Sequence, residues 1–99
     1  MKVNITSLHF KTDKKLESYI QEKIEKLSGI YDGLLSSEVV LRVEKNENDK
    51  NKVAEIKLSI RGNDLFAKKQ STSFEQATDT AVEALRKQLV KHKEKIKGL

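Results

Sequence analysis

The apolar residues of this 99-residue sequence follow two different spacings in turn, and this alternation strongly constrains the fold. In the first spacing every second residue is apolar, which is typical of a strand with one buried face. In the second, apolar residues recur every three or four positions, which is typical of an amphipathic helix. The order is strand, helix, three strands, helix. The sequence therefore predicts an α+β fold, β-α-β-β-β-α, in a single domain over residues 1–99.

Four segments carry the spacing of a strand. They are residues 2–8, 38–44, 54–61 and 65–70. A loop without apolar residues, 46–52, joins the second segment to the third, and Gly62-Asn63-Asp64 is a turn signal between the third and the fourth. Short polar connections of this kind predict that the last three strands form antiparallel hairpins.

The first helical segment covers residues 12–27. Thr12 or Asp13 can cap its start by accepting a hydrogen bond from a free backbone amide. Gly29 can end it by adopting a positive φ.

The second helical segment begins at Phe74 and continues for about 24 residues without a proline. Either Ser73 with Gln76 or Thr72 with Glu75 matches a capping box at its start. The apolar stripe of this segment consists of Phe74, Ala77, Ala81, Leu85, Leu89, His92 and Ile96.

Chain direction follows from the order of these elements. The first helix is a crossover, so the first two strands run parallel, while the later strands alternate in direction. The first and fourth strands then point the same way, and the helices that follow them are expected to lie parallel on one face of a mixed four-stranded sheet. Both helices end at the same edge. The second is longer by about 8 residues, so it should overhang the sheet by roughly 12 Å.

Positive charge is concentrated near the end of the second helix. The chain has 20 Lys and Arg against 15 Asp and Glu, for a net charge of +5. Residues 86–97 contain six of these cations and one carboxylate, Glu94, so this window alone carries the net charge of the whole chain. The six cations form two rows on opposite flanks of the apolar stripe, one of Lys87, Lys91 and Lys95 and the other of Arg86, Lys93 and Lys97.

The first helix adds Lys23, within its apolar stripe, and Lys26, one turn from its end, to the same edge. Two simpler explanations stay open. The helix macrodipole favours cations in the last turn of any helix, and Lys23 can extend its ammonium to solvent from an apolar surface. We expect Lys14 and Lys15 to be solvated. Lys68 and Lys69 point to opposite faces of a strand, so at most one of them can join the patch.

A dense cationic edge predicts a polyanionic partner, and nucleic acid is the abundant one. A double-stranded-RNA-binding domain has a similar sheet-plus-helix architecture, but its lysines stand at the start of the last helix, which is acidic here. The sequence has neither the RNP aromatics of an RRM nor the GxxG loop of a KH domain. Recognition through backbone charge and shape is therefore expected, rather than through the bases.

The sequence offers little for catalysis or for metal binding. It contains no Cys and only two histidines, His9 and His92, for which we expect structural roles. We therefore predict that the protein is not an enzyme and has no catalytic residue, metal site or cofactor. No apolar run approaches the roughly 20 residues that span a bilayer, and residues 1–6 lack the long apolar stretch of a signal peptide. A cytoplasmic protein without a membrane partner is expected.

The sequence resembles the bacterial ribosome hibernation-promoting factors and ribosome-associated inhibitors. The most specific part of the resemblance is the last helix, RKQLVKHKEKIK at residues 86–97. Further similar segments are NIT at 4–6, KL at 26–27, YD at 31–32 and VVLRVEK at 39–45. The resemblance covers nearly the whole chain.

The resemblance implies the same fold and a single ribosome-binding domain that is a monomer off the ribosome. It also implies binding to the small ribosomal subunit, through ribosomal RNA with ribosomal proteins as additional candidates. Binding would occupy the channel of messenger RNA and transfer RNA, compete with both, inhibit translation and promote inactive, dimerised ribosomes. The implied RNA-binding residues are Lys23, Lys26, Arg86, Lys87, Lys91, His92, Lys93 and Lys95.

The chain departs from the family pattern at the start of the last helix. Family members usually have Asp, then Met or Leu, then Tyr, where this chain has Ser73, Phe74 and Glu75. We expect the chain to correspond to the short form of the family, which needs a separate modulation factor to pair ribosomes. An alternative is a protein-binding regulator whose long helix docks on an acidic partner, as in the family's older description as a sigma-factor modulator.

Overall fold

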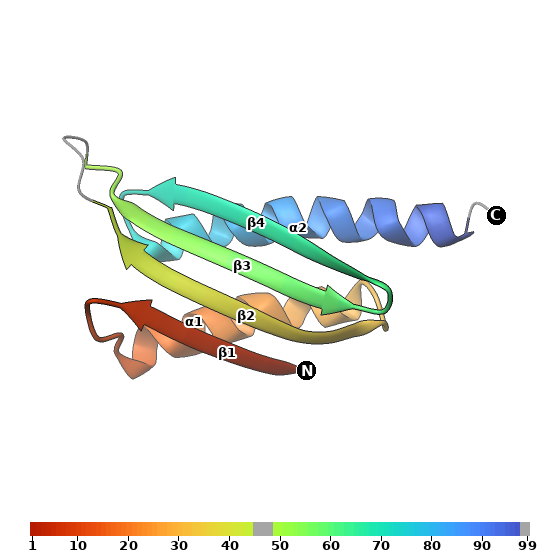
Figure 1. The fold of residues 1–99 in the computed structure, drawn as a ribbon, viewed down its shortest axis with the longest axis horizontal. Coiled ribbons are helices and arrows are strands. Elements are labelled where there is room, and N and C mark those ends of the chain that lie inside the picture. The colour runs from red at the N-terminus through yellow and green to blue at the C-terminus, as the bar shows by residue number, and fades with distance from the viewer. Residues whose placement is uncertain (45–48, 98–99) are drawn as a thin grey trace.

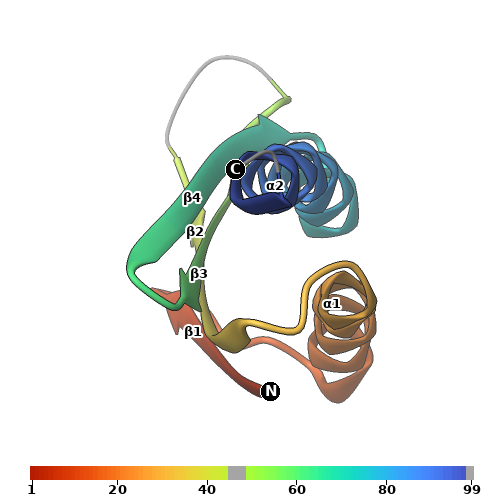
Figure 2. The ribbon, with the colours of Figure 1, turned by 90° about the vertical axis from the view of Figure 1, so that its right-hand side faces the viewer.

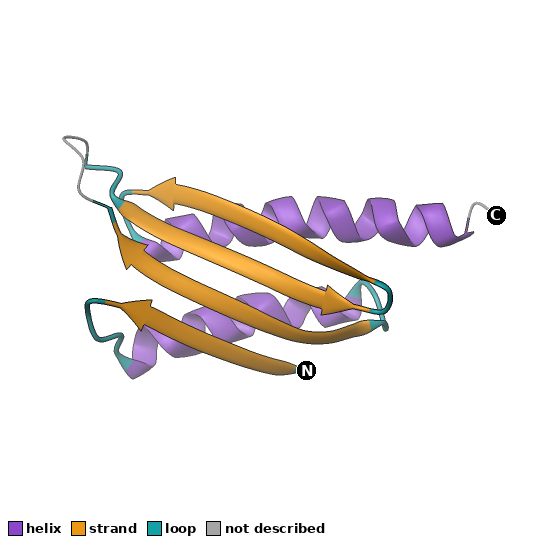
Figure 3. Ribbon diagram, viewed as in Figure 1, coloured by secondary structure: helices purple, strands orange, loops and turns teal. Residues whose placement is uncertain are grey.

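The computed structural model describes residues 1–44 and 49–97 and has the predicted order of elements (Figures 1 and 3). Residues 46–48 of the predicted 46–52 loop lie outside the described part, as do residue 45 and the side chains of Ile96 and Lys97. The elements are β1 (Lys2–Leu8), α1 (Lys14–Glu25), the 3-10 helix η1 (Lys26–Gly29), β2 (Leu34–Val43), β3 (Lys52–Ile60), β4 (Asn63–Ser71) and α2 (Phe74–Lys97).

The four strands form one mixed sheet in the order β1-β2-β3-β4. β1 pairs with β2 in parallel, with Ile5 opposite Val39, and the other two pairs of strands are antiparallel. Figure 2 shows both helices on the same face of this sheet, and in Figure 1 they run in the same direction. The predicted fold class and the parallel helices are confirmed.

The core lies between the sheet and the two helices. From α2, the side chains of Ala77, Ala81, Leu85 and Leu89 are fully buried, as the predicted stripe requires. They pack with α1 residues such as Ile20 and Ile24 and with sheet residues such as Leu41, Ile56 and Leu58. At the start of α2, the Phe74 ring stacks on Phe10, with 4.9 Å between the ring centroids.

Side chains cap both helices at their first turns. Asp13 Oδ1 accepts a hydrogen bond from the Leu16 amide at 2.7 Å, so of the two predicted residues it is Asp13 that caps α1. Ser73 Oγ accepts a hydrogen bond from the backbone amide of Gln76 at 3.1 Å. Gln76 Oε1 in turn accepts hydrogen bonds from the Ser71 and Thr72 hydroxyls, so Ser73 with Gln76, and not Thr72 with Glu75, caps α2.

The first helix ends differently from the prediction. The α-helix stops at Glu25, and η1 continues it through a tighter turn in which the Ile30 amide donates to the Leu27 carbonyl at 3.0 Å. Gly29 lies within η1 and does not have a positive φ, so its predicted role was wrong. The 3-10 turn carries the chain towards β2 without a left-handed residue.

The bounds of the last three strands also differ from the prediction, and Lys52, predicted in the loop, begins β3. β2 begins at Leu34, four residues earlier than expected, because a register shift between Leu34 and Ser36 and a fully buried Ser37 interrupt its apolar alternation. The turn between β3 and β4 consists of Arg61 and Gly62, with φ of 77° at Gly62, while Asn63 already pairs with Ile60. The predicted turn was therefore placed too late.

The last turns of α2 extend beyond the end of the sheet (Figure 1). Helix α2 has 24 residues against 12 in α1, and the molecule measures 47 × 26 × 18 Å along its principal axes. The predicted overhang is confirmed; the basic segment begins beside β4, where Gln88 Nε2 donates to the Phe66 carbonyl, and its last turns form the overhang.

We expect Leu85→Ala to lower the free energy of unfolding by about 2–5 kcal/mol, because it leaves a cavity between α2 and the sheet. Urea denaturation followed by circular dichroism measures this loss. Leu35→Ala is the control, since the Leu35 side chain is 55% exposed, and it should change stability by no more than about 0.5 kcal/mol. Equal losses in the two variants would contradict the packing described here.

Candidate nucleic-acid interface

The basic half of α2, residues 86–95, carries its cations on both flanks of a buried apolar stripe. Leu85 and Leu89 are fully buried, and this fixes the rotation of the helix about its axis. Arg86, Lys87, Lys91 and Lys95 are exposed, and Lys93 is half-buried. Among residues 1–44 and 49–95, none of the four lysines of this segment has an ion-pair partner within 4.0 Å. Their charge is therefore available to an external anion.

The two predicted rows of cations lie on different flanks of α2. Figure 2 views the molecule from the end at which α2 overhangs the sheet, with β4 on one side of this helix and α1 on the other. Arg86 faces α1, where a groove of about 360 Å³ separates the helices. Lys87 faces β4, and helical spacing places Lys91 and Lys95 in the same row. The groove towards α1 is lined by Lys23, Lys26, Leu27, Ile30, Asp79, Val82, Glu83 and Arg86.

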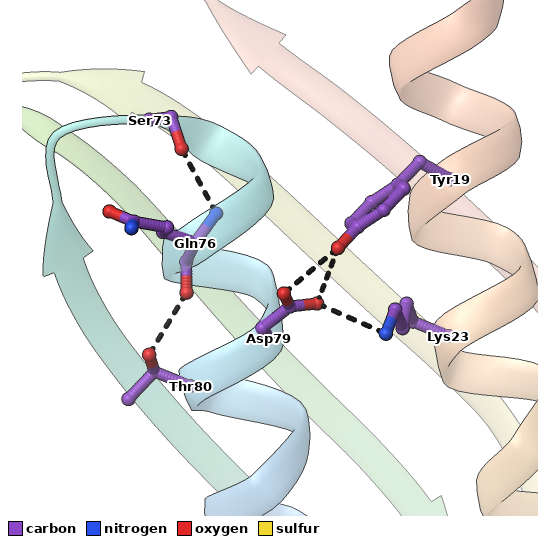
Figure 4. Close-up of polar contacts among 6 residues, drawn as sticks. All are labelled: Tyr19, Lys23, Ser73, Gln76, Asp79 and Thr80. Atoms are coloured by element: carbon purple, nitrogen blue, oxygen red, sulfur yellow. Dashed lines mark hydrogen bonds and ion pairs between the residues drawn. The ribbon is translucent and has the colours of Figure 1, made fainter.

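Lys23 is not free in this groove. Its ammonium lies 3.5 Å from Asp79 Oδ1 and 5.5 Å from the centre of the Tyr19 ring. The Tyr19 hydroxyl donates to both carboxylate oxygens of Asp79, at 2.7 and 2.9 Å (Figure 4). Lys23 therefore does more than extend into solvent, because its charge is compensated across the helix–helix contact.

Hydrogen bonding to Asp79 raises the pKa of Tyr19 to about 12, with further contributions from burial and from the charges of Asp79 and Glu75. The carboxylate accepts a hydrogen bond from the neutral phenol and would repel a phenolate. The neutral side chain thus helps to hold α1 against α2.

Arg86 also has a carboxylate partner. Its Nε lies 3.3 Å from Glu83 Oε2, one turn earlier on the same helix. Both side chains are more than half exposed, so the pair contributes little to stability and opens readily. In the groove, Asp79 and Glu83 thus balance Lys23 and Arg86. Within the described part of the chain, Lys26 has no ion-pair partner.

His92 is half-buried and contacts a second aromatic ring. Its ring meets the Tyr31 ring edge to face, with 5.2 Å between the centroids. Its Nε2 is buried and has no hydrogen-bond partner in the described residues. This nitrogen is therefore not presented to an external partner, and the contact of His92 with RNA stays a prediction.

Other kinds of site find no support among residues 1–44 and 49–97. No cluster of three or more His, Asp or Glu side chains there could hold a metal ion. Neither helix, within the same described residues, is long and apolar enough to cross a membrane.

Residues 3–97 match the model of the family described as sigma 54 modulation protein / S30EA ribosomal protein. The chain belongs to this family. The predicted resemblance is thereby confirmed, and it extends over nearly all of the sequence.

Relatives of this S30EA family member include three proteins named ribosome hibernation promoting factor. The one from Pseudomonas putida is 30% identical over 99 residues, which are 100% of this chain and 93% of that protein. The one from Azotobacter vinelandii is 34% identical over 95 residues, covering 96% and 85% of the two chains. The one from Escherichia coli K12 is 29% identical over 97 residues, covering 98% of each.

Two solved structures have the same fold. A ribosomal subunit interface protein from Coxiella burnetii has a TM-score of 0.82 at 17% identity, covering 94% of this chain and 98% of that one. The N-terminal domain of Protein Y from Thermus thermophilus has a TM-score of 0.81 at 22% identity, covering 93% and 99%. The sheet and both helices described above are thus the fold of these proteins.

Sequence reasoning missed Tyr19 and Asp79 as parts of the site of this S30EA family member. They are 60 positions apart, and each stands on an amphipathic helix where a polar residue is ordinary. No spacing rule links them. Only the parallel alignment of the two helices, already predicted, could have indicated that their flanks meet.

A Tyr31→Phe background leaves Tyr19 as the only tyrosine. Ultraviolet titration of this variant should give a Tyr19 pKa of about 12. Adding Asp79→Asn should lower the Tyr19 pKa towards 10.0. The pKa of Tyr19 is higher in the folded protein than in the unfolded chain. The stabilisation of the fold by its hydrogen bond to Asp79 is therefore complete below about pH 10. It is lost as the pH rises from about 10 to about 12. Asp32→Asn, which changes an exposed carboxylate that does not contact Tyr19, is the control. An unchanged pKa in Asp79→Asn would contradict the assigned contact.

Proposed function

We propose that this chain is a non-enzymatic ribosome hibernation factor of the cytoplasm. In this proposal residues 1–99 form one ribosome-binding domain, a monomer off the ribosome, that binds the small subunit in the channel of messenger RNA and transfer RNA. Its presence there excludes both ligands, inhibits translation and favours inactive, dimerised ribosomes. Family membership and the names of the relatives support hibernation. The observation that carries the mode of binding is the set of lysines on the basic half of α2 that have no ion-pair partner within the described residues.

The proposed contacts are made with phosphates of ribosomal RNA. Lys26, Lys87, Lys91, Lys93 and Lys95 contribute charge that has no ion-pair partner in the described part of the free protein. Lys23 and Arg86 are paired with carboxylates in the free protein. On binding, each leaves its carboxylate partner and pairs with a phosphate of the RNA. Since both of these ion pairs are at least one-third exposed, the exchange costs little.

The overhang explains why a helix suits this task. A row of cations follows each flank of α2, and the last turns of this helix extend beyond the end of the sheet, where both flanks can be approached. Such a helix can be inserted between two phosphate strands. Phosphate contacts of this type position a protein without reading base sequence, and they also speed its association with a polyanion.

We expect Lys87→Glu combined with Lys91→Glu to abolish co-sedimentation with purified small subunits. Each lost phosphate contact weakens binding by roughly five- to eight-fold at about 0.1 M monovalent salt, so two contacts account for at least about 25-fold, before added repulsion. Both residues are exposed, so circular dichroism should show a folded protein.

The matched control is Lys14→Glu combined with Lys15→Glu. These residues are also exposed, and the change in net charge is identical. They lie at the start of α1, at the opposite end of the molecule from the overhang (Figure 1). This control should co-sediment nearly as the wild type does. If the two double variants bind equally well, the assigned surface is wrong.

The alternative function is that of a protein-binding regulator, which docks the same basic helix on an acidic partner. The words 'sigma 54 modulation protein' in the family description support this alternative. Ribonuclease treatment of the protein's complexes in a cell lysate distinguishes the two. Loss of association after treatment supports the ribosomal function, and association that resists ribonuclease supports the alternative.

A further inference from the structure

Lys69 stands beside the basic half of α2 but belongs to β4. On this strand Leu65 and Ala67 face the helices and are buried, so the alternation of a strand places Lys69 on the helix side of the sheet. Its neighbour Lys68 is exposed on the opposite side. Lys69 is half-buried at the edge where α2 covers β4.

A hollow of about 400 Å³ joins Lys69 to the row of cations on this flank of α2. It is lined by Lys69, Asp79, Thr80, Glu83, Ala84 and Lys87. The short side chains of Thr80 and Ala84 leave room between the two lysines. The polar groups of this hollow are thus two ammonium groups, a hydroxyl and two carboxylates.

The two carboxylates are engaged on the other flank of α2. Asp79 accepts from the Tyr19 hydroxyl and pairs with Lys23, and Glu83 pairs with Arg86. Within the described residues, neither Lys69 nor Lys87 has an ion-pair partner. Within the described residues, Lys69 and Lys87 are therefore unpaired in this hollow, whereas in the groove between the helices Lys23 and Arg86 are paired and Lys26 alone is unpaired.

We propose that Lys69 is a phosphate-binding residue and, with Lys87, Lys91 and Lys95, forms a track for one RNA strand along the β4 flank of α2. The three helical lysines follow one another at a rise of about 6 Å, four residues at 1.5 Å each. That is comparable to the distance between successive phosphates of an RNA strand. Lys69 extends the same track onto the sheet. The proposal rests on the proposed function, because it adds a residue of β4 to the surface proposed there for small-subunit RNA.

The test is the binding of Lys69→Gln to purified small subunits over a range of monovalent salt. One lost phosphate contact should weaken binding by roughly five- to eight-fold at about 0.1 M salt. It should also make the slope of log K against log salt less negative by about 0.7–0.9. Lys68→Gln is the matched control, with the same change one residue away on the opposite face, and should alter neither quantity. Lys69→Arg keeps the positive charge, so both its affinity and its salt slope should match those of the wild type.

Equal behaviour of Lys69→Gln and Lys68→Gln would overturn the assignment of Lys69. Weaker binding with an unchanged slope would also overturn it, because a contact with an acidic ribosomal protein releases no counterions condensed on RNA. Failure of Lys69→Arg to restore binding would show that the loss comes from packing and not from charge. If the wild-type protein itself does not bind small subunits, the proposed function fails.

Discussion

The direction of β1 and β4 controls the arrangement of everything else in this protein. Both strands point the same way, so the helices that follow them run parallel along one face of the sheet. The fully buried Leu85 and Leu89 then fix how α2 is turned about its axis. Together these constraints bring the ends of both helices to one edge and point the two rows of cations towards α1 and towards β4.

The two halves of helix α2 carry opposite charge. Its acidic first half faces α1, where Asp79 accepts from the Tyr19 hydroxyl and pairs with Lys23. Its basic second half begins beside β4 and ends past the sheet, and its lysines have no acidic partner within the described residues. Asp79 and Glu83 also compensate Lys23 and Arg86 on the α1 flank, whereas no cation of the β4 flank has an ion-pair partner within the described residues. We therefore regard the β4 flank as the stronger attraction for a polyanion in the proposed function.

Periodic features were predictable from the sequence, and features without a period were not. The stripe through Ala77, Leu85 and Leu89 predicted α2 and its buried face because each of these residues repeats the same local environment. The buried Ser37 concealed the start of β2, since a hydroxyl breaks an apolar pattern even where the side chain is enclosed. The contact of Tyr19 with Asp79 depends on how two helices align, which composition and spacing within either helix do not encode.

The salt dependence of wild-type binding to purified small subunits tests the central claim most directly. If about six phosphates are neutralised, log K should fall against log salt with a slope of roughly −4 to −5, because each contact releases condensed counterions. Affinity that is nearly independent of salt would contradict the account. Recognition would then rest on packing or on neutral hydrogen bonds, and the uncompensated lysines of α2 would have another purpose.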